Sequence, residues 1–475
     1  MASFGLRTKR KGVDHLLGYM IRQIDADAKV SEQVRLEALE QVIPYTAIQA
    51  VIAAHGLQRQ RKRKLSAETG LLLGIAMHLF RGCSLRQVLW KLMKGVRLLW
   101  PGTQPASKGA VSQLRYEIGA RPMVDLFHQV CQPLARPDTP GAFWKGLRLM
   151  GMDGTDESVA DTPANERFFG RHTAGWGVAA FPQLKAVHLV ELGSHAIIDT
   201  GVWPVHSGEK LLGKRLVRSL TGEMLVLWDC GFHSFDLVKR TLARGAQLLG
   251  RLPANVKVQP IKRLADGSQL IDLVQRDHHG RPQEAIRLRL IEYTVRDPAL
   301  PGYGERRRLI TSLLDETVYP ALELAQLYHE RWEVEITIDE IDTHQRQTAA
   351  HFRSLKPVGV IQEFYGLLIA HYAIRKILLD AAQQADLDPD RLSFTNALEL
   401  IVDSLYDFQF LDPAQQAPRY QQLLRDLAAF RLPPRENRSN PRVVRAKSTN
   451  FNMKRPEHDH WPQPTTPFRD AIVLI

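Results

Sequence analysis

The sequence predicts an α/β protein flanked by helical segments. Four short apolar stretches (147–155, 181–192, 194–205 and 224–228) are typical of strands, and 235–245 has the apolar spacing of an amphipathic helix. The stretch 224–228 is apolar throughout, which indicates a strand buried on both faces of a mixed sheet. Strands of this kind, followed by a helix, are typical of the α/β class.

Residues 1–135 are predicted to form a helical N-terminal domain. Apolar residues recur at helical spacing in 32–43, 67–80 and 84–96. The nearest approach to a membrane span, 71–80, is much shorter than the roughly 18 apolar residues that such a span needs. We therefore expect a buried helix there and no membrane partner.

Two helices of this domain have the order of a helix-turn-helix DNA reader. Ser84 is placed to cap the first helix, and Ser107 begins the second after a turn rich in proline and glycine. Lys108, Gln113 and Arg115 on the second helix would then contact DNA. An ordinary helical bundle would give the same pattern, and these residues leave both interpretations open.

Three further regions follow along the chain. The α/β region spans 140–380, and within it 246–314 has strand-like runs and turn signals that predict a β-rich insertion. The last region, 381–475, is predicted to be helical with a basic tail, because 431–455 contains eight Lys or Arg residues and one Glu. Such a basic arm is typical of segments that bind phosphate.

The composition favours a polyanionic partner and a reducing compartment. The chain has 475 residues and a formal net charge of +12, with a sequence pI of about 9.6; this favours nucleic acid as the partner. Its three cysteines (Cys83, Cys131 and Cys230) stand far apart, which fits neither a disulfide framework nor a zinc site. The first residues lack the apolar core of a secretion signal, so we expect a cytoplasmic protein.

One segment, 328–346, concentrates six acidic side chains in this basic chain. If the segment forms a regular helix, one stripe beside its apolar face contains Tyr328, Arg331, Glu335, Asp339 and Asp342. A second group is expected to be solvated: Glu330, Glu333 and Glu340. An ion pair between Arg331 and Glu335, four residues apart, explains part of the stripe without any chemistry.

Asp153 and Asp229 end two of the predicted strands, and a glycine follows each of them within two residues. Carboxylates at strand ends that face a third carboxylate on a helix, here Glu335, can hold two Mg²⁺ ions about 4 Å apart. Such a site activates water or a 3′-hydroxyl and stabilises the attacking and leaving oxygens at phosphorus. A single strand-end aspartate is commonplace, but the combination in a basic chain predicts phosphoryl transfer on nucleic acid.

The DDE transposases of the insertion-sequence-four family resemble this chain over nearly its whole length. The resemblance in the α/β region is carried by FWKGLRLMGMDGT, FPQLKAVHLVEL, LVLWDCGF and RLITSLLD. Tyr328, Arg331 and Glu335 have the Y-x-x-R-x-x-x-E spacing of the family signature. The family's N-terminal domain is similar to LSAETGLLLGIAMHLFRGCSLRQVLWKL, and its C-terminal segment is similar to SNPRVVRAKSTNFNMKR.

The resemblance implies a ribonuclease-H-like mixed sheet that the β-rich insertion interrupts before Glu335. It implies that Asp153, Asp229 and Glu335 are the catalytic residues and the ligands of Mg²⁺, with two ions bound and Mn²⁺ able to replace them. It also implies that Tyr328 and Arg331 contact DNA.

This chain departs from the family signature at Asp342, where the family has a lysine. An acid two helical turns beyond Glu335 would repel a DNA phosphate rather than bind it. We expect the nearby His344 and Arg346 to supply the contact instead.

The implied protein is a bacterial transposase, cytoplasmic and associated with the nucleoid. It would bind the terminal inverted repeats of its element in double-stranded DNA as a homodimer and cleave with metal-activated water. It would then join the 3′-OH ends to target DNA without a covalent enzyme intermediate. Two alternatives remain: a catalytically silent DNA-binding protein descended from a transposase, and a ribonuclease-H-like nuclease without strand transfer. The departure at Asp342 permits the first; the extra end-recognition domain and basic tail argue against the second.

Overall fold

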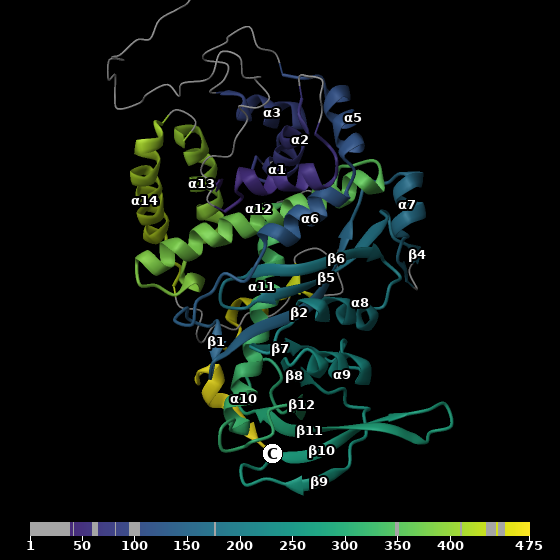
Figure 1. Ribbon diagram of the computed structural model, residues 1–475. Helices are drawn as coiled ribbons and strands as arrows, with labels where there is room; N and C mark the ends of the chain where they lie inside the picture. Colours follow the sequence, from purple (N-terminus) through teal and green to yellow (C-terminus); the bar gives the residue numbers. More distant parts are fainter. Residues whose placement is uncertain are drawn as a thin grey trace, which may run out of the picture.

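The protein is long, with helices at one end and β structure at the other (Figure 1). The computed structural model describes residues 39–40, 42–58, 65–80, 82–94, 105–174, 177–346, 351–408, 411–433, 443–444 and 452–475. Helices from both the N-terminal and C-terminal parts of the chain gather at one end, and the β-rich insertion forms the other.

The core of the sheet is mixed, as the sequence predicts. Its strands run β6 (Ala196–Pro204), β5 (Gln183–Glu191), β2 (Leu147–Ser158), β7 (Met224–Trp228) and β8 (Gln247–Arg251). The first three pair antiparallel, whereas β2, β7 and β8 pair parallel to one another. The mixed α/β fold is thus confirmed, and β7 is buried at every position, as its apolar sequence indicates.

The β-rich insertion continues the same sheet beyond β8. Its strands follow in the order β12 (Arg307–Thr311), β11 (Pro282–Val295), β10 (Gln269–Arg276) and β9 (Pro260–Arg263), all antiparallel. Near the end of the chain β15 (Ile472–Leu474) also pairs with β11. The predicted insertion boundary at residue 246 therefore includes β8, which in the structure belongs to the parallel core.

Helices cover both faces of the core sheet. Successive residues of a strand point to opposite faces. A side chain on Gly151 of β2 would collide with Val334 of α11 (Trp332–Asp339), whereas the next residue, Met152, lies against α8 (Glu209–Leu216). Since neighbouring residues of β2 meet these two helices, α11 and α8 contact opposite faces of the central strand.

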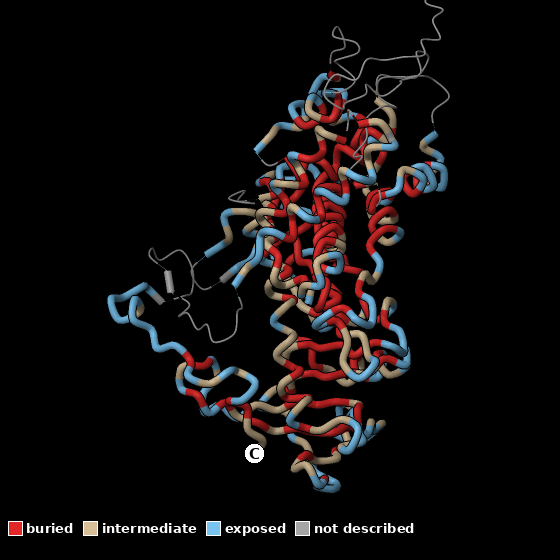
Figure 2. Tube along the Cα trace, turned by 90° about the vertical axis from the view of Figure 1, so that its left-hand side faces the viewer, coloured by how far each residue is buried: buried red, intermediate tan, exposed pale blue. Residues whose placement is uncertain are grey.

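One long helix, α12 (Pro357–Gln384), connects the sheet to the helical end of the molecule. Most of its residues are buried, because it packs against β6 on one side and against helices from both ends of the chain on the other. Its helical neighbours are α2 (Ala67–Ala76), α6 (Arg121–Val130), α13 (Phe394–Phe408) and α14 (Pro413–Ala429). Figure 2 shows buried positions running from this helical end into the sheet.

The predicted helix starts in the N-terminal region are confirmed. Ser84 caps α3 (Leu85–Leu92) with a capping box, and the Ser107 side chain accepts a hydrogen bond from the first turn of α5 (Lys108–Ile118). Both helices pack against α2, and α1 (Tyr45–Ala54) completes this group. These helices therefore form a bundle with α12 at its base.

The remaining elements are short. They are β1 (Phe143–Trp144), α7 (Pro163–Phe169), β3 (Thr173–Ala174), β4 (Gly177–Val178), α9 (Phe235–Ala243), α10 (Ala321–Leu327), β13 (Val443–Val444), β14 (Asn452–Met453) and the 3-10 turns Val217–Ser219, Pro389–Arg391, Pro456–His460 and Phe468–Ala471. Two predicted segments, 32–43 and the basic tail 431–455, lie largely outside the described residues. No helix within the described ranges is both long enough and apolar enough to cross a membrane.

Candidate active site

The central strands β2 and β7 separate at the point where two acidic residues stand. Their pairing ends with Met152 opposite Trp228. Asp153 and Asp229 are the next residues on each strand, and β2 continues beyond this point paired only with β5. The sheet therefore opens beside both aspartates, which leaves room for groups from either face.

Asp153 is held by a backbone donor and a guanidinium. Its Oδ1 accepts a hydrogen bond from the Gly154 N–H at 2.8 Å, and its Oδ2 accepts one from Arg331 Nη1 at 3.1 Å. Burial raises the pKa of Asp153 to about 6 despite these two stabilising contacts, and the nearby charges of Asp229 and Glu335 add to the increase. Asp153 therefore lies within electrostatic reach of both other carboxylates.

Asp229 is fixed by the backbone that follows it and by a tyrosine beneath it. Its Oδ1 accepts a hydrogen bond from the Gly231 N–H at 2.8 Å. The Tyr328 hydroxyl donates to the carbonyl oxygen of Trp228, the residue before Asp229, at 3.3 Å. Tyr328 is buried, and this burial raises the pKa of its hydroxyl above the ordinary range. A neutral, buried Tyr328 thus supports the end of β7.

Glu335 comes from α11 on one face of the sheet. Its Oε1 accepts a hydrogen bond from Arg331 Nη2 at 2.7 Å, while the other terminal nitrogen of the same guanidinium contacts Asp153. The predicted ion pair between Arg331 and Glu335 is therefore present, and it extends to Asp153. Arg331 lies between two of the three acids as their counterion.

The segment that carries Glu335 is not one regular helix. It begins as a 3-10 turn (Tyr328–Arg331), continues as α11 and ends as a π-helical turn (Glu340–Gln345). The expectation that Glu340 is solvated is wrong: the residue is 5% exposed. Its carboxylate accepts hydrogen bonds from Arg375 of α12, at 2.8 Å from Nε, and lies 3.1 Å from His371 Nε2. Because Arg375 on α12 pairs with Glu340, the glutamate is buried rather than solvated.

A buried ion network anchors this helical segment to the rest of the fold. His195, in the turn between β5 and β6, has a left-handed backbone (φ 58°) and a fully buried ring. Its Nε2 lies 2.9 Å from Glu333 Oε2 and 3.3 Å from Asp390 Oδ1, and its Nδ1 lies 3.3 Å from Glu340 Oε1. Burial alone would lower the pKa of His195, but Glu340 and Asp390 outweigh it and raise that pKa well above its usual value. His195 and its acidic partners thus connect both ends of α11 to the turn between β5 and β6.

His195, Glu333 and Asp390 are also the one set of three potential metal ligands, within the described ranges, whose atoms lie within 4.8 Å of one another. The Arg375 guanidinium contacts His195 Nδ1 and pairs with Glu340 beside this set, so we interpret the set as part of a buried ion network.

Two family models match the chain. The first, Insertion element 4 transposase N-terminal, matches residues 33–128, and the second, Transposase DDE domain, matches residues 144–373. Together they cover well over half of the sequence. The chain belongs to the insertion element 4 family of DDE transposases. Its broad function is that of a DNA transposase, with the nuclease and transferase chemistry that the family implies.

Relatives of this transposase include two proteins of Escherichia coli (strain K12). It is 28% identical over 434 residues to the transposase InsG for insertion sequence element IS4, covering 90% of this chain and 93% of InsG. It is 24% identical over 218 residues to the putative transposase InsZ, covering 42% of this chain and 73% of InsZ. Among solved structures, a piggyBac transposase synaptic complex with hairpin DNA aligns with 14% identity and a TM-score of 0.41 over 88% of each chain.

The family implies a divalent metal ion, and the residues at the opening of the sheet fit one. Asp153, Asp229 and Glu335 offer only oxygen ligands, which suit a hard cation such as Mg²⁺. The Arg331 guanidinium already lies between Asp153 and Glu335, so this position accommodates positive charge. The two aspartates and the glutamate are therefore the residues at this opening that would suit such an ion.

Asp342 is half-buried beside another acid in this transposase. Its carboxylate lies beside Glu157 of β2 and 3.6 Å from Arg346 Nη1. Burial, followed by the charge of Glu157, raises the pKa of Asp342 to about 9. Burial and the neighbouring Glu157 thus favour the protonated form of Asp342, whereas the sequence alone suggests a negative charge facing a phosphate.

The two residues expected to replace the family lysine have different surroundings. Arg346 is 9% exposed, pairs with Glu157 and stacks over Phe352, with 4.4 Å between the guanidinium carbon and the ring centroid. Its predicted DNA contact is not available in this conformation, because the guanidinium is used within the fold. His344 is 42% exposed and lies 3.3 Å from Asp339, so its predicted contact with DNA stays open.

Arg115, one of the residues predicted to contact DNA, is buried and bonded within the fold. It is 8% exposed, and its guanidinium donates to Gln362 Oε1 at 3.1 Å and to the Gly359 carbonyl at 2.9 Å. These bonds join α5 to the start of α12, so the guanidinium of Arg115 is used within the helical bundle in this conformation. Lys108 and Gln113 lie on the exposed side of α5, where DNA contact remains a prediction. Tyr328, buried under Trp228, is likewise closed to DNA in this conformation.

One acidic residue near the site was missed by sequence reasoning. Glu209 begins α8, and its Oε1 lies 3.4 Å from Lys185 Nζ, which also pairs with Asp156 at 3.0 Å. An acid in the first turn of a helix is ordinary, because it interacts favourably with the helix dipole. Nothing in the sequence therefore distinguishes Glu209 from a simple helix-start residue.

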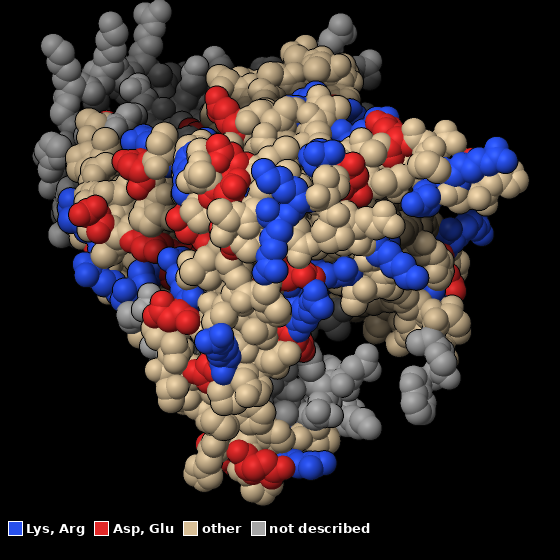
Figure 3. Space-filling model, turned by 90° about the horizontal axis from the view of Figure 1, so that it is seen from below, with Lys and Arg blue, Asp and Glu red and all other residues tan. Residues whose placement is uncertain are grey.

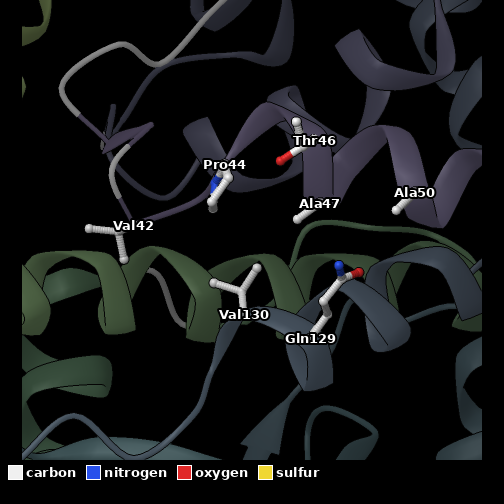
Figure 4. A pocket seen from close by; sticks show the side chains of 7 residues that line it. All are labelled: Val42, Pro44, Thr46, Ala47, Ala50, Gln129 and Val130. Carbon is white, nitrogen blue, oxygen red and sulfur yellow. The ribbon is translucent and has the colours of Figure 1, made fainter.

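A shallow pocket elsewhere in the transposase has no chemistry of its own. It lies between α1 and α6 and is lined by Val42, Pro44, Thr46, Ala47, Ala50, Gln129 and Val130 (Figure 4). None of these side chains is ionisable, so the pocket offers no group for acid, base or metal chemistry.

Proposed function

We propose that this transposase cuts DNA at the ends of its own element and joins the exposed 3′-OH ends to target DNA. Asp153, Asp229 and Glu335 are the proposed catalytic residues and metal ligands, with Mg²⁺ as the physiological ion. The observation that carries the proposal is electrostatic: Asp153 shares a guanidinium with Glu335, and its pKa is raised by burial together with the charges of Asp229 and Glu335. Three partly buried carboxylates beside one shared guanidinium are suited to bind divalent metal.

The chain's own groups orient the carboxylates before any substrate arrives. The N–H groups of Gly154 and Gly231 each hold one oxygen of a nearby aspartate, and Arg331 holds the second oxygen of Asp153. Bound divalent ions would supply an activated water or 3′-hydroxyl and neutralise charge at phosphorus. Because the ligands are held beforehand, little reorganisation is needed when DNA binds.

Arg331 would act differently with and without metal. In the metal-free state it neutralises Asp153 and Glu335. When positive charge arrives between these acids, the guanidinium is repelled and must leave at least one of them. It is then free to contact a DNA phosphate, which is the role that the family signature implies for this position.

Binding of double-stranded DNA is supported by the positive charge of the chain. The net charge of +12 is carried in part by exposed residues of the insertion, among them Lys257, Lys262, Arg263 and Arg281. Figure 3 views the molecule from the insertion end, where basic side chains are interspersed with acidic ones. Such a mixed surface suits contacts with a phosphate backbone at particular points rather than a uniform basic track. Pairing of two transposon ends would require a homodimer.

The proposal is tested with DNA that carries the inverted repeats flanking the gene. We expect Mg²⁺-dependent nicking at the repeat end, followed by strand-transfer products with a target plasmid. Asp153→Asn should lose cleavage by more than about 10³-fold while end binding changes by less than about threefold, because a metal ligand contributes to chemistry more than to docking.

Other outcomes select the alternatives. Binding without nicking in either Mg²⁺ or Mn²⁺ would identify a catalytically silent DNA-binding protein, and nicking without strand transfer would identify a nuclease. Light scattering of the protein with and without end DNA tests whether two copies assemble on two ends.

A further inference from the structure

Glu209 approaches the proposed active site from the face of the sheet opposite to Glu335. It is the first residue of α8, which contacts β2 on the face away from α11. The pairing of β2 with β7 stops just before Asp153 and Asp229, so the sheet offers no barrier between its two faces there. Carboxylates from both sides can therefore meet at this opening.

Two glycines mark where the Glu209 carboxylate lies. A Cβ on Gly231 would be 3.0 Å from Asp229 Oδ1 and 3.5 Å from Glu209 Oε2, so both oxygens border the same small volume. A Cβ on Gly154 would be 3.3 Å from Glu209 Oε1. One carboxylate oxygen thus lies beside the loop after β7, and the other lies beside the residue that follows Asp153.

The ion pair with Lys185 does not account for this position. Lys185 Nζ is closer to Asp156, at 3.0 Å, than to Glu209, at 3.4 Å. Two carboxylates, Asp156 and Glu209, therefore share the single ammonium group of Lys185. Glu209 is 40% exposed, which leaves it open to an incoming cation.

We propose that Glu209 is a fourth carboxylate of the metal site and binds a divalent cation, directly or through a bound water, together with Asp229. This inference rests on the proposed function, because it takes the triad as the remaining ligands. Two metal ions about 4 Å apart need more oxygen ligands than three carboxylates and water readily orient, and a fourth acid on the opposite face completes the set. Lys185 holds Glu209 in the metal-free protein, as Arg331 holds Glu335.

The test is Mn²⁺ binding to the full-length protein. Binding is measured as the decrease in the electron paramagnetic resonance signal of free Mn²⁺. Glu209→Gln keeps the size of the side chain and removes its charge, and we expect it to lose one bound ion or to weaken binding about tenfold or more. Lys185→Met removes the competing cation and should tighten binding. If Glu209 serves only as a partner of Lys185, neither substitution changes Mn²⁺ binding, and the inference is overturned.

A matched control is available on the neighbouring helix. Asp236 of α9 pairs with Lys214 at 2.9 Å and with Arg240 at 2.9 Å, so Asp236→Asn makes the same change in net charge. It should leave Mn²⁺ binding unaltered. Circular dichroism reports whether each variant folds, and Glu209→Asp, which keeps the charge but shortens the reach, replaces Glu209→Gln if that variant does not fold.

The triad variants separate this inference from the function on which it rests. If Asp153→Asn and Glu335→Gln reduce Mn²⁺ binding but Glu209→Gln and Glu209→Asp do not, only the role of Glu209 is refuted. If neither triad variant reduces Mn²⁺ binding, the proposed metal site itself is wrong. Loss of binding in all of them, with Asp236→Asn unchanged, supports four ligands.

Discussion

Arg331 joins Asp153 and Glu335 across the opening of the sheet, with 3.1 Å from Nη1 to Asp153 Oδ2 and 2.7 Å from Nη2 to Glu335 Oε1. The aspartate comes from a central strand and the glutamate from a helix 182 positions later in the chain, so one guanidinium closes the site between two distant elements. A divalent ion could therefore replace the guanidinium as the cation between these two carboxylates.

Arg331→Gln should lower the folding stability of the metal-free protein. It should also increase the stabilisation that added Mg²⁺ provides. Loss of the guanidinium leaves Asp153 and Glu335 without their counterion, which we expect to cost about 2 kcal/mol of folding free energy. That is below the 3–5 kcal/mol typical of a fully buried pair, because these carboxylates are 23% and 31% exposed. Added Mg²⁺ should raise the melting temperature of the variant by more than that of the wild type.

Arg240→Gln provides the comparison for this prediction. Arg240 pairs with Asp236 at 2.9 Å on an exposed helix face, and exposed pairs contribute only about 0.5 kcal/mol. The variant should behave like the wild type with and without Mg²⁺. An Arg331→Gln protein whose melting temperature shifts no more with Mg²⁺ than that of the wild type would show that Arg331 does not occupy the cation position.

The Asp342 carboxyl should make stability depend on pH. Its folded pKa is about 9, whereas an unfolded aspartate titrates near ~3.9. Between these values the folded state holds a proton that the unfolded state has released, so stability falls as pH rises, by at most about 1.4 kcal/mol per pH unit. Asp342→Asn removes this titration and should therefore stabilise the protein more at pH 8.5 than at pH 6.

Urea unfolding at several pH values measures this effect. Asp339→Asn is the control, because Asp339 lies one helical turn earlier on the same segment and is 57% exposed. Its effect on stability should be small and nearly constant with pH. A gain from Asp342→Asn that does not grow between pH 6 and pH 8.5 would mean that Asp342 is ionised beside Glu157.

Arg115 should contribute to the stability of the helical bundle rather than to DNA sequence recognition. Arg115→Ala leaves Gln362 and the Gly359 carbonyl without their donor in a buried position, which we expect to cost about 3 kcal/mol. Lys108→Ala, on the exposed side of the same helix, should change stability by less than about 0.5 kcal/mol. Thermal unfolding and binding to end DNA and random DNA are measured for both variants. A stable Arg115→Ala protein with reduced preference for end DNA would restore Arg115 as a base reader.

Features set by neighbouring residues could be predicted from the sequence, whereas distant partners could not. The end of β7 before Asp229 and the helix caps at Ser84 and Ser107 depend on local patterns, and the structure has them where the patterns place them. The predicted strand end at Asp153 is wrong, because β2 continues to Ser158 through its pairing with β5. Helical periodicity put Glu340 in solvent, yet its partner Arg375 comes from another helix 35 positions later.

The same limit explains the misjudged basic residues. Arg346 pairs with Glu157, which lies 189 positions earlier, and Arg115 bonds to Gln362, 247 positions later. In the sequence of a basic protein, a basic residue without a nearby acid is easily interpreted as a DNA contact. Its carboxylate or carbonyl partner within the fold is identified only in the structure. Glu209 was not singled out from the sequence for the same reason. Its closeness to Asp229 depends on how the strands pair.

Gly231→Ala should weaken metal binding without altering any charge. The new Cβ would lie 3.0 Å from Asp229 Oδ1 and 3.5 Å from Glu209 Oε2, so it would push one or both oxygens away from the opening. The backbone of Gly231 is not in the left-handed region, so alanine is tolerated there and the fold should persist. Gly208→Ala is the control: Gly208 lies next to Glu209, and a Cβ there would meet nothing within 4 Å.

We expect Mn²⁺ binding to weaken about tenfold in Gly231→Ala and to stay unchanged in Gly208→Ala, with similar melting temperatures for both. Equal Mn²⁺ binding by the two variants would place the metal away from the volume that Asp229 and Glu209 border.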